Sequence, residues 1–203
     1  MLKTTHKILN IFAEKPWKKH TFKQIKKLSK NKSDSYIYNT LKKFVKTEIL
    51  QQETAGKTIL YSAKKTQKAT AWLQWASEYT AWNQKHIPHK QIEKIIPKIP
   101  TNFFTLIITG SYAKKQQKPE SDIDIVILCD KDPQKVYAEI RQKCELSIPE
   151  IHPYVFTEKE FYKMLTNKEP NYGKETVNNN FILTGGAAYY QILFEAISNG
   201  FNS

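Results

Sequence analysis

The fold of the second half of this chain is decided by one stretch of sequence, FFTLIITGSYAKKQQKPESDIDIVIL, which covers residues 103–128. Its apolar, β-favouring start predicts a buried strand over 103–108. Gly110 and Ser111 follow as a turn, and a polar, lysine-rich loop comes next. The run 122–128 predicts a second buried strand, and two aspartates stand at its beginning. The stretch therefore predicts two strands with a Gly-Ser turn after the first and carboxylates at the start of the second.

Asp122 and Asp124 are two residues apart, so on a strand their side chains project from the same face. Two adjacent carboxylates are costly unless a positive charge lies between them. Oxygen-only ligands favour Mg²⁺ or Mn²⁺. Gly110 and Ser111 offer backbone N–H groups and a hydroxyl to phosphate oxygens, and a Cβ at the glycine would obstruct a phosphate. The pattern predicts a site that holds a nucleoside triphosphate with a metal ion between its phosphates and the aspartates.

Gly110-Ser111, ten intervening residues and then Asp122-x-Asp124 resemble the signature of the DNA-polymerase-β-like nucleotidyltransferase superfamily, and most closely its minimal members. The resemblance implies a mixed β-sheet backed by helices. It also implies transfer of a nucleoside monophosphate from an NTP, ATP being our first choice, to an acceptor. By the resemblance, Asp122 and Asp124 are catalytic metal ligands, and Gly110 and Ser111 bind the nucleotide.

The superfamily has a third acidic residue on a later strand. Residues 149–157 predict such a strand, after a helix over 133–143. Glu150, His152 and Tyr154 alternate on one of its faces. We choose Glu150 for the third position, as metal ligand or as the base that deprotonates the acceptor hydroxyl. The superfamily usually has aspartate there, and His152 is the alternative.

Three lysines, Lys114, Lys115 and Lys118, are expected in the loop before the second strand, and we choose Lys114 as a triphosphate contact. Helices are expected after Thr157 and over residues 172–183. Gly185 and Gly186 lack the lysine and hydroxyl residue of a phosphate loop, so we interpret them as a turn between helices.

The first half predicts three helices and a hairpin within about 60 residues. Thr21 and Ser33 are expected to cap the second and third helices. Ile37, Leu41, Phe44 and Val45 form an apolar stripe on the third, and two extended runs flank Gly56. This order resembles the winged helix-turn-helix family of DNA-binding domains. The resemblance implies DNA contacts from the third helix and the hairpin, at Ser35, Asn39, Lys42, Lys43 and Lys57.

The excess of basic over acidic residues belongs entirely to the first half of the chain. Residues 1–100 hold 21 Lys/Arg against 6 Asp/Glu, whereas residues 101–203 hold 11 against 13. Such asymmetry predicts two functional units, of which the first faces a polyanion. The alternative is a winged helix that contacts protein, with solvated lysines.

The predicted architecture is α+β, with a winged helix-turn-helix at 1–65, a helical connector at 66–100 and a nucleotidyltransferase domain at 101–203. A connector helix is expected over 70–85. Its aromatic residues alternate in steps of three and four, the spacing of a coiled-coil seam, at Trp72, Trp75, Tyr79 and Trp82. This stripe either pairs across a homodimer or packs within the chain. No apolar run approaches the length of a membrane span, and we expect a cytoplasmic protein with Cys129 and Cys144 reduced.

Taken together, the sequence predicts a Mg²⁺-dependent nucleotidyltransferase coupled to a DNA-binding domain. The acceptor hydroxyl belongs to a protein, a nucleic acid or a small molecule; small superfamily members that adenylylate a partner protein make a protein acceptor plausible. The alternative is a transcription regulator whose transferase-like domain only binds or senses a nucleotide.

Overall fold

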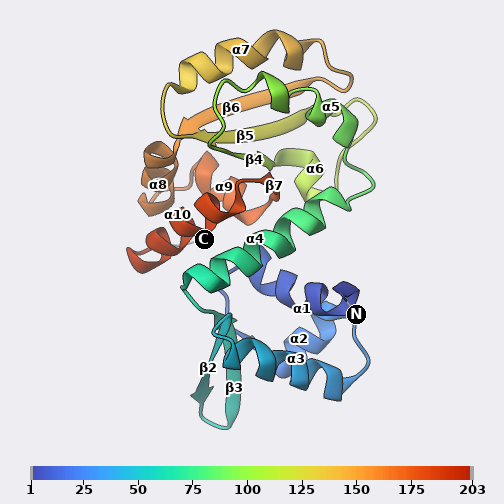
Figure 1. Ribbon diagram of the computed structural model, residues 1–203, viewed down its shortest axis with the longest axis vertical. Helices are drawn as coiled ribbons and strands as arrows, with labels where there is room; N and C mark the ends of the chain where they lie inside the picture. The colour runs from blue at the N-terminus through green and yellow to red at the C-terminus, as the bar shows by residue number, and fades with distance from the viewer. Residues whose placement is uncertain (1, 202–203) are drawn as a thin grey trace. The chain divides into compact units, whose positions relative to one another are not determined.

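The computed structural model describes residues 2–201. The chain divides into two compact units, unit 1 at Met1–Ser77 and unit 2 at Glu78–Ser203, and the division falls within the long helix α4, Gln67–Trp82 (Figure 1). Each unit is described by itself below.

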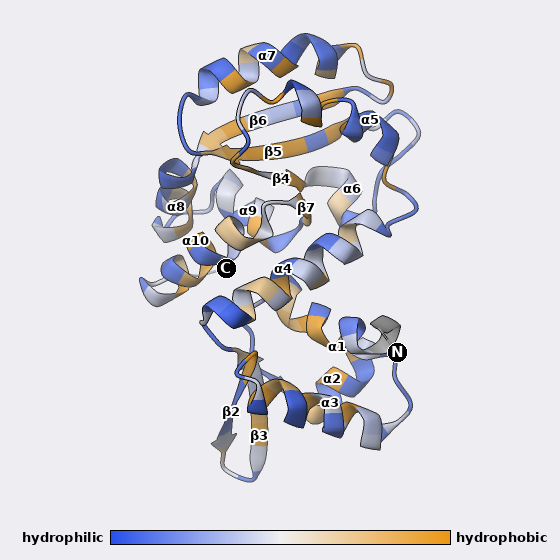
Figure 2. Ribbon diagram, viewed as in Figure 1, coloured by the Kyte–Doolittle hydropathy of each residue, from blue (hydrophilic) through white to orange (hydrophobic). Residues whose placement is uncertain are grey.

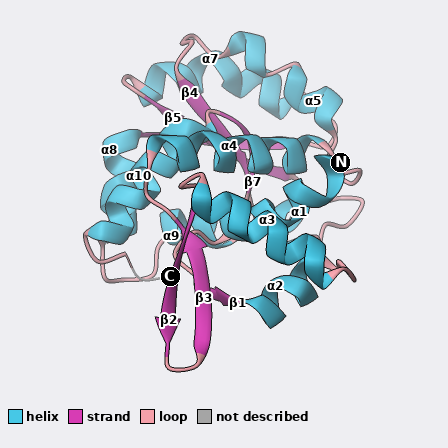
Figure 3. Ribbon diagram, turned by 60° about the horizontal axis from the view of Figure 1, so that its bottom comes forward, coloured by secondary structure: helices cyan, strands magenta, loops and turns pink. Residues whose placement is uncertain are grey.

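Unit 1 contains three packed helices and a small antiparallel sheet. The sheet has the order β1-β3-β2, and the paired strands β2 and β3 form a long hairpin (Figure 3). Its elements before α4 are α1 (Leu2–Glu14), β1 (His20–Thr21), α2 (Phe22–Ser29), α3 (Asp34–Lys46), β2 (Leu50–Ala55) and β3 (Thr58–Ala63).

Both predicted helix caps in unit 1 are confirmed. The Thr21 hydroxyl accepts a hydrogen bond from the Gln24 amide, and the Gln24 side chain accepts one from the Thr21 amide, which completes a capping box. The Ser33 hydroxyl accepts from the Tyr36 amide at the start of α3. On α3, Ile37, Leu41 and Phe44 are buried as predicted, whereas Val45 is only half-buried.

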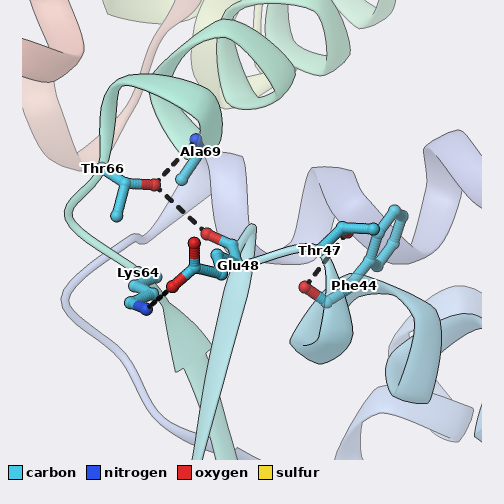
Figure 4. Close-up of polar contacts among 6 residues, drawn as sticks. All are labelled: Phe44, Thr47, Glu48, Lys64, Thr66 and Ala69. Atoms are coloured by element: carbon cyan, nitrogen blue, oxygen red, sulfur yellow. Dashed lines mark hydrogen bonds and ion pairs between the residues drawn. The ribbon is translucent and has the colours of Figure 1, made fainter.

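A group of polar contacts ties the end of α3 to the start of α4 (Figure 4). Glu48 adopts a left-handed backbone with φ of 62°, which turns the chain from α3 into β2. Its carboxylate pairs with Lys64, and its carbonyl accepts a hydrogen bond of 3.2 Å from the Thr66 hydroxyl. The same hydroxyl accepts a hydrogen bond of 3.1 Å from the Ala69 amide. Thr66 therefore caps α4 and fixes its first turn to the hairpin.

The three tryptophans of the α4 stripe make contacts within the chain, although Trp72 and Tyr79 remain 39% and 38% exposed. Trp72 and Trp75 contact each other edge to face, with Phe44 beside Trp72 and His6 beside Trp75. In unit 2, the Trp82 indole donates a hydrogen bond of 2.8 Å to the carbonyl of Leu183. These contacts fit the packing interpretation of the stripe, and a homodimer stays a prediction.

Unit 2 is built on a mixed four-stranded sheet with the order β6-β5-β4-β7. Strands β5 and β6 are parallel and joined by a crossover helix, and the other neighbours are antiparallel. An α+β architecture with a mixed sheet is thus observed. Its elements are α5 (His89–Glu93), η1 (Ile96–Lys98), β4 (Phe104–Ile108), α6 (Gly110–Lys114), β5 (Ile123–Cys129), α7 (Pro133–Glu145), β6 (Ile151–Thr157), α8 (Glu158–Thr166), α9 (Tyr172–Asn178), β7 (Phe181–Thr184) and α10 (Gly186–Ser198).

The central strands β4 and β5 are apolar along nearly their whole length, because both of their faces are covered (Figure 2). Ile123, Ile125 and Ile127 of β5 belong to one core cluster with Val136 and Ile140 of α7. Cys129 and Cys144 are buried free thiols in the same cluster. Burying such a side chain stabilises the folded state by roughly 1.5–3 kcal/mol. The buried apolar residues further along β5 therefore hold the start of this strand in place.

The expectation of one helix over residues 172–183 is wrong. Helix α9 ends at Asn178, and Phe181–Thr184 form β7, an edge strand beside β4. The β4 edge left open by β5 supplies hydrogen-bond partners that local propensity does not reveal. Gly185 and Gly186 consequently lie between a strand and α10 rather than between helices; Gly185 has φ of 74°, and a Cβ there would lie 2.4 Å from the carbonyl oxygen of Phe104.

Candidate functional site

The polar side chains at the start of β5 and β6 form a square on one face of the sheet. Asp124 is the register partner of His152 in the parallel pair. One step earlier, the Ile123 amide donates a hydrogen bond of 2.8 Å to the Glu150 carbonyl, which places Asp122 beside Glu150. Alternate residues of a strand share a face, so all four side chains project to the same side. The predicted neighbours Asp122, Asp124 and Glu150 are therefore brought together, and so is the alternative, His152.

His152 turns back toward the two outer carboxylates. Its Nε2 lies 3.4 Å from Glu150 Oε1 and 3.7 Å from Asp122 Oδ2, and one ligand atom from each of the three residues lies within 4.8 Å of the others. The three side chains are each between 44 and 46% exposed. Carboxylate oxygens and an imidazole nitrogen are common ligands of divalent cations, and partial exposure leaves positions for water or substrate. The residues present thus fit a divalent metal ion.

Gly110 is required by its contact with Asp124. It adopts a left-handed backbone with φ of 63°, and a Cβ at this position would lie 1.9 Å from Asp124 Oδ2. A side chain at residue 110 would therefore displace the carboxylate from the site. The sequence pattern explains this glycine by the approach of a phosphate; the structure adds a reason within the protein, because Asp124 already occupies the space that a Cβ would fill.

The Asp124 side chain is half-buried at the start of β5. Burial is the main cause that raises the pKa of its carboxyl above the ordinary aspartate value, and nearby His152 acts in the opposite direction. Asp122 and Glu175 add repulsion that raises the same pKa further. The fold therefore holds a carboxylate where its negative charge is unfavourable, which is a common property of groups with a functional role.

Ser111 and Lys114 lie on α6, directly after Gly110. The Ser111 hydroxyl has no hydrogen-bond partner among the described residues and is half-buried. Lys114 is the last residue of this helix, so its predicted place in a loop is wrong. Its ammonium lies 2.7 Å from Glu175 Oε1 on α9. Lys114 is therefore near the aspartates but already paired, and both members of this pair influence Asp124.

Sequence reasoning missed Glu175 and Tyr172, which α9 brings to the site. Burial, followed by the charge of Asp124, raises the pKa of the Tyr172 phenol, which keeps it protonated and a hydrogen-bond donor. The phenol oxygen is buried without a partner among the described atoms, and the ring lies 4.6 Å from that of Tyr154. Nothing in the sequence marks these residues, since no motif links α9 to β5.

A groove opens beside the two missed residues, with a volume of about 710 Å³. It runs along α9 and the segment before it. It is lined by Lys168, Pro170, Asn171, Tyr172, Lys174, Glu175 and Asn178. Space for a substrate group is thus available beside Tyr172 and Glu175, the two groove residues that interact electrostatically with Asp124.

In unit 1, the predicted DNA-contacting residues all lie on the surface. Ser35, Asn39, Lys42 and Lys43 are exposed on α3, and Lys57 is exposed in the hairpin. The side of α3 opposite its buried stripe is therefore free of covering structure within unit 1. DNA contact by these residues stays a prediction.

The residues of unit 2 that form this arrangement fall inside a region that matches a family model. Residues 89–182 match the family model of the nucleotidyltransferase domain. The matched range contains the Gly-Ser pair, all four members of the polar square and Glu175. The nucleotidyltransferase domain indicates transfer of a nucleotidyl group in general, and proteins with this domain typically use divalent metal ions. No curated protein and no solved structure matches the chain significantly. Among the described residues, no helix has the length and apolar character needed to cross a membrane.

We expect Gly110→Ala to destabilise unit 2 by roughly 2 kcal/mol or more, because it combines a left-handed backbone with a collision against Asp124. The collision should be relieved in an Asp124→Ala background. Chemical denaturation of the two single variants and the double variant measures this coupling, expected at about 1 kcal/mol or more. Gly200→Ala is the control, because Gly200 also has a positive φ but nothing within 4 Å of a Cβ. Strictly additive effects would contradict the contact.

We expect Asp124→Asn to raise the melting temperature of the metal-free protein at neutral pH by a few degrees. A carboxyl whose folded pKa is raised disfavours the folded state when it is ionised, and this cost disappears below its pKa. The advantage of the asparagine variant should therefore shrink as the pH falls through the folded pKa of Asp124. Thermal unfolding across this pH range tests the sign, with the exposed Asp130→Asn as control.

Proposed function

We propose that unit 2 is a metal-dependent nucleotidyltransferase that moves a nucleoside monophosphate from an NTP, with ATP as first choice, to an acceptor hydroxyl. The observation that carries the proposal is the convergence of Asp122, Asp124 and Glu150 on one face, beside Gly110 and Ser111, within a nucleotidyltransferase domain. A structural acidic turn would not require a second strand to bring its own carboxylate to the same point.

The proposed roles follow from the placement of each side chain. Asp122, Asp124 and Glu150 hold Mg²⁺ or Mn²⁺, which would neutralise phosphate charge and stabilise the charge that develops during transfer. The Ser111 hydroxyl donates to a phosphate oxygen. Lys114 leaves Glu175 and contacts the triphosphate. Its ammonium group thereby exchanges a carboxylate, with one negative charge, for a phosphate group that carries more negative charge.

In the proposed reaction, the acceptor oxygen forms a bond to the α-phosphorus as the bond to the bridging oxygen breaks, and pyrophosphate leaves. The acceptor proton passes to a carboxylate; in the alternative role for Glu150, in which it is the base instead of a metal ligand, this half-exposed carboxylate accepts the proton. The acceptor is a protein, a nucleic acid or a small molecule, and the groove beside Glu175 offers room for part of it.

Incubation with Mg²⁺ or Mn²⁺, each labelled NTP and candidate RNA, DNA and protein acceptors tests this function. We expect label transfer that falls about 100-fold or more in Asp122→Asn and in Asp124→Asn, because each change removes a proposed metal ligand. Asp130→Asn, an exposed aspartate just beyond the other end of β5, is the matched control and should keep full activity.

Transfer that persists in both aspartate variants would contradict the proposed site. Nucleotide binding without transfer to any acceptor would favour the alternative, a regulator whose transferase-like domain only senses a nucleotide.

We further propose that unit 1 is a winged helix-turn-helix that binds DNA, and that the protein is a cytoplasmic one. The supporting observations are the order α1-β1-α2-α3-β2-β3, the antiparallel sheet β1-β3-β2 and the exposed polar face of α3. The excess of lysine in this half supplies the charge that phosphates attract.

DNA affinity should fall steeply with salt concentration, because lysines that contact phosphates release counterions. The double variant Lys42→Ala/Lys43→Ala should weaken binding and reduce the slope of log K against log salt by about 2. Fluorescence anisotropy at several salt concentrations measures both. Lys159→Ala/Lys163→Ala, an exposed lysine pair on α8, is the charge-matched control. An affinity that does not depend on salt would contradict DNA binding through these lysines.

A further inference from the structure

His152 places a nitrogen donor inside a group of carboxylates. Its Nε2 faces Glu150 Oε1 at 3.4 Å along its own strand and Asp122 Oδ2 at 3.7 Å across to β5. A histidine at the register position of Asp124 need not point this way, since its side chain is 44% exposed and has open solvent beside it. The imidazole therefore lies at the same place where the proposed metal would bind.

The spacing of these atoms matches that of neighbouring ligands around one metal ion. Bonds of about 2.1 Å at octahedral angles separate adjacent ligand atoms by about 3 Å, and tetrahedral angles separate them by about 3.4 Å. The two distances from Nε2 are close to this range, and all three ligand atoms lie within 4.8 Å of one another. Small side-chain rotations of exposed residues are sufficient to bring them onto a common ion.

The three residues also leave room for further ligands. They come from one edge of the sheet and project to one side, so they occupy one face of a coordination sphere. The opposite face is open to solvent, because each of the three side chains is nearly half exposed. Water or substrate oxygens can complete the sphere, as catalytic metal sites require.

The donor set differs from the oxygen-only set that Mg²⁺ prefers. Mg²⁺ is a hard ion that binds oxygen, whereas imidazole nitrogen suits the first-row transition metals. We propose that Asp122, Glu150 and His152 form a mixed carboxylate–imidazole centre that selects a transition-metal dication such as Mn²⁺ over Mg²⁺. The role of this metal in catalysis rests on the proposed function. The set of residues that bind the metal can, however, be measured without turnover.

The other explanation of the same geometry is an ion pair. A protonated His152 would satisfy Asp122 and Glu150 without any metal, and its removal would then affect stability or charge but not the choice between two dications. Metal selectivity, rather than affinity alone, therefore separates the two explanations.

The direct test is the electron spin echo envelope modulation of Mn²⁺ bound to the whole protein without nucleotide. We expect a ¹⁴N coupling from a coordinated imidazole in the wild type and its loss in His152→Ala. A nitrogen signal that persists in His152→Ala comes from another histidine and overturns the proposal. The absence of any nitrogen coupling in the wild type overturns it as well.

The second test is calorimetric titration with Mn²⁺ and with Mg²⁺. The ratio of the two dissociation constants should favour Mn²⁺ in the wild type. His152→Asp restores an oxygen-only set, so it should keep Mg²⁺ binding and lower the preference for Mn²⁺ by about tenfold or more. An unchanged ratio in a folded His152→Asp protein, verified by circular dichroism, contradicts the proposal. His86→Gln, at a histidine whose ring is hydrogen-bonded to the Tyr112 carbonyl in the middle of α6, is the control and should leave the ratio unchanged.

Failure here is distinguishable from failure of the proposed function. Nucleotidyl transfer with Mg²⁺ alone and no ¹⁴N coupling would reject the mixed centre and keep the transferase. A clear ¹⁴N coupling in a protein that transfers nothing to any acceptor would keep the centre and reject the transferase.

Discussion

The parallel pairing of β5 with β6 is the constraint on which the candidate site depends. The pairing sets Asp124 beside His152 and, two residues earlier on each strand, Asp122 beside Glu150. Because the side-chain period of a strand is two, a shift of β6 by one residue would turn Glu150 and His152 to the opposite face of the sheet. The four polar side chains would then no longer lie together. The register is in turn fixed by the apolar residues further along both strands, which pack under α7 and cannot be moved to solvent without a large loss of buried area.

The site is formed at the expense of local stability. Asp124 is held half-buried beside two other acidic side chains, and Gly110 must adopt a left-handed backbone to leave space for it. Glycine also loses more conformational entropy on folding than other residues. Such choices are unfavourable for a structural turn, but they position a carboxylate that a cation would stabilise. This is the pattern expected where natural sequences place function ahead of stability.

The two units contribute different chemistry. Unit 2 has nearly balanced charge and holds the cluster of Asp122, Glu150 and His152 at the start of two adjacent strands, which suits a metal ion. Unit 1 holds the basic surplus and an exposed polar helix face. If unit 1 binds DNA as proposed, it would keep unit 2 close to DNA.

The sequence by itself determined the hairpin strands, the strands near 103–108, 122–128 and 149–157, the helix caps and the aspartate pair, because strand period, capping chemistry and buried apolar runs are local properties. Thr21, Ser33 and the stretch 103–128 illustrate this. Only the tertiary structure decided that Glu150 and His152 both reach the aspartates, that Gly110 is required by Asp124, that Lys114 pairs with Glu175, and that residues 181–184 form a strand. These facts depend on strand neighbours and on contacts between residues up to 61 positions apart, and no local pattern encodes such partners.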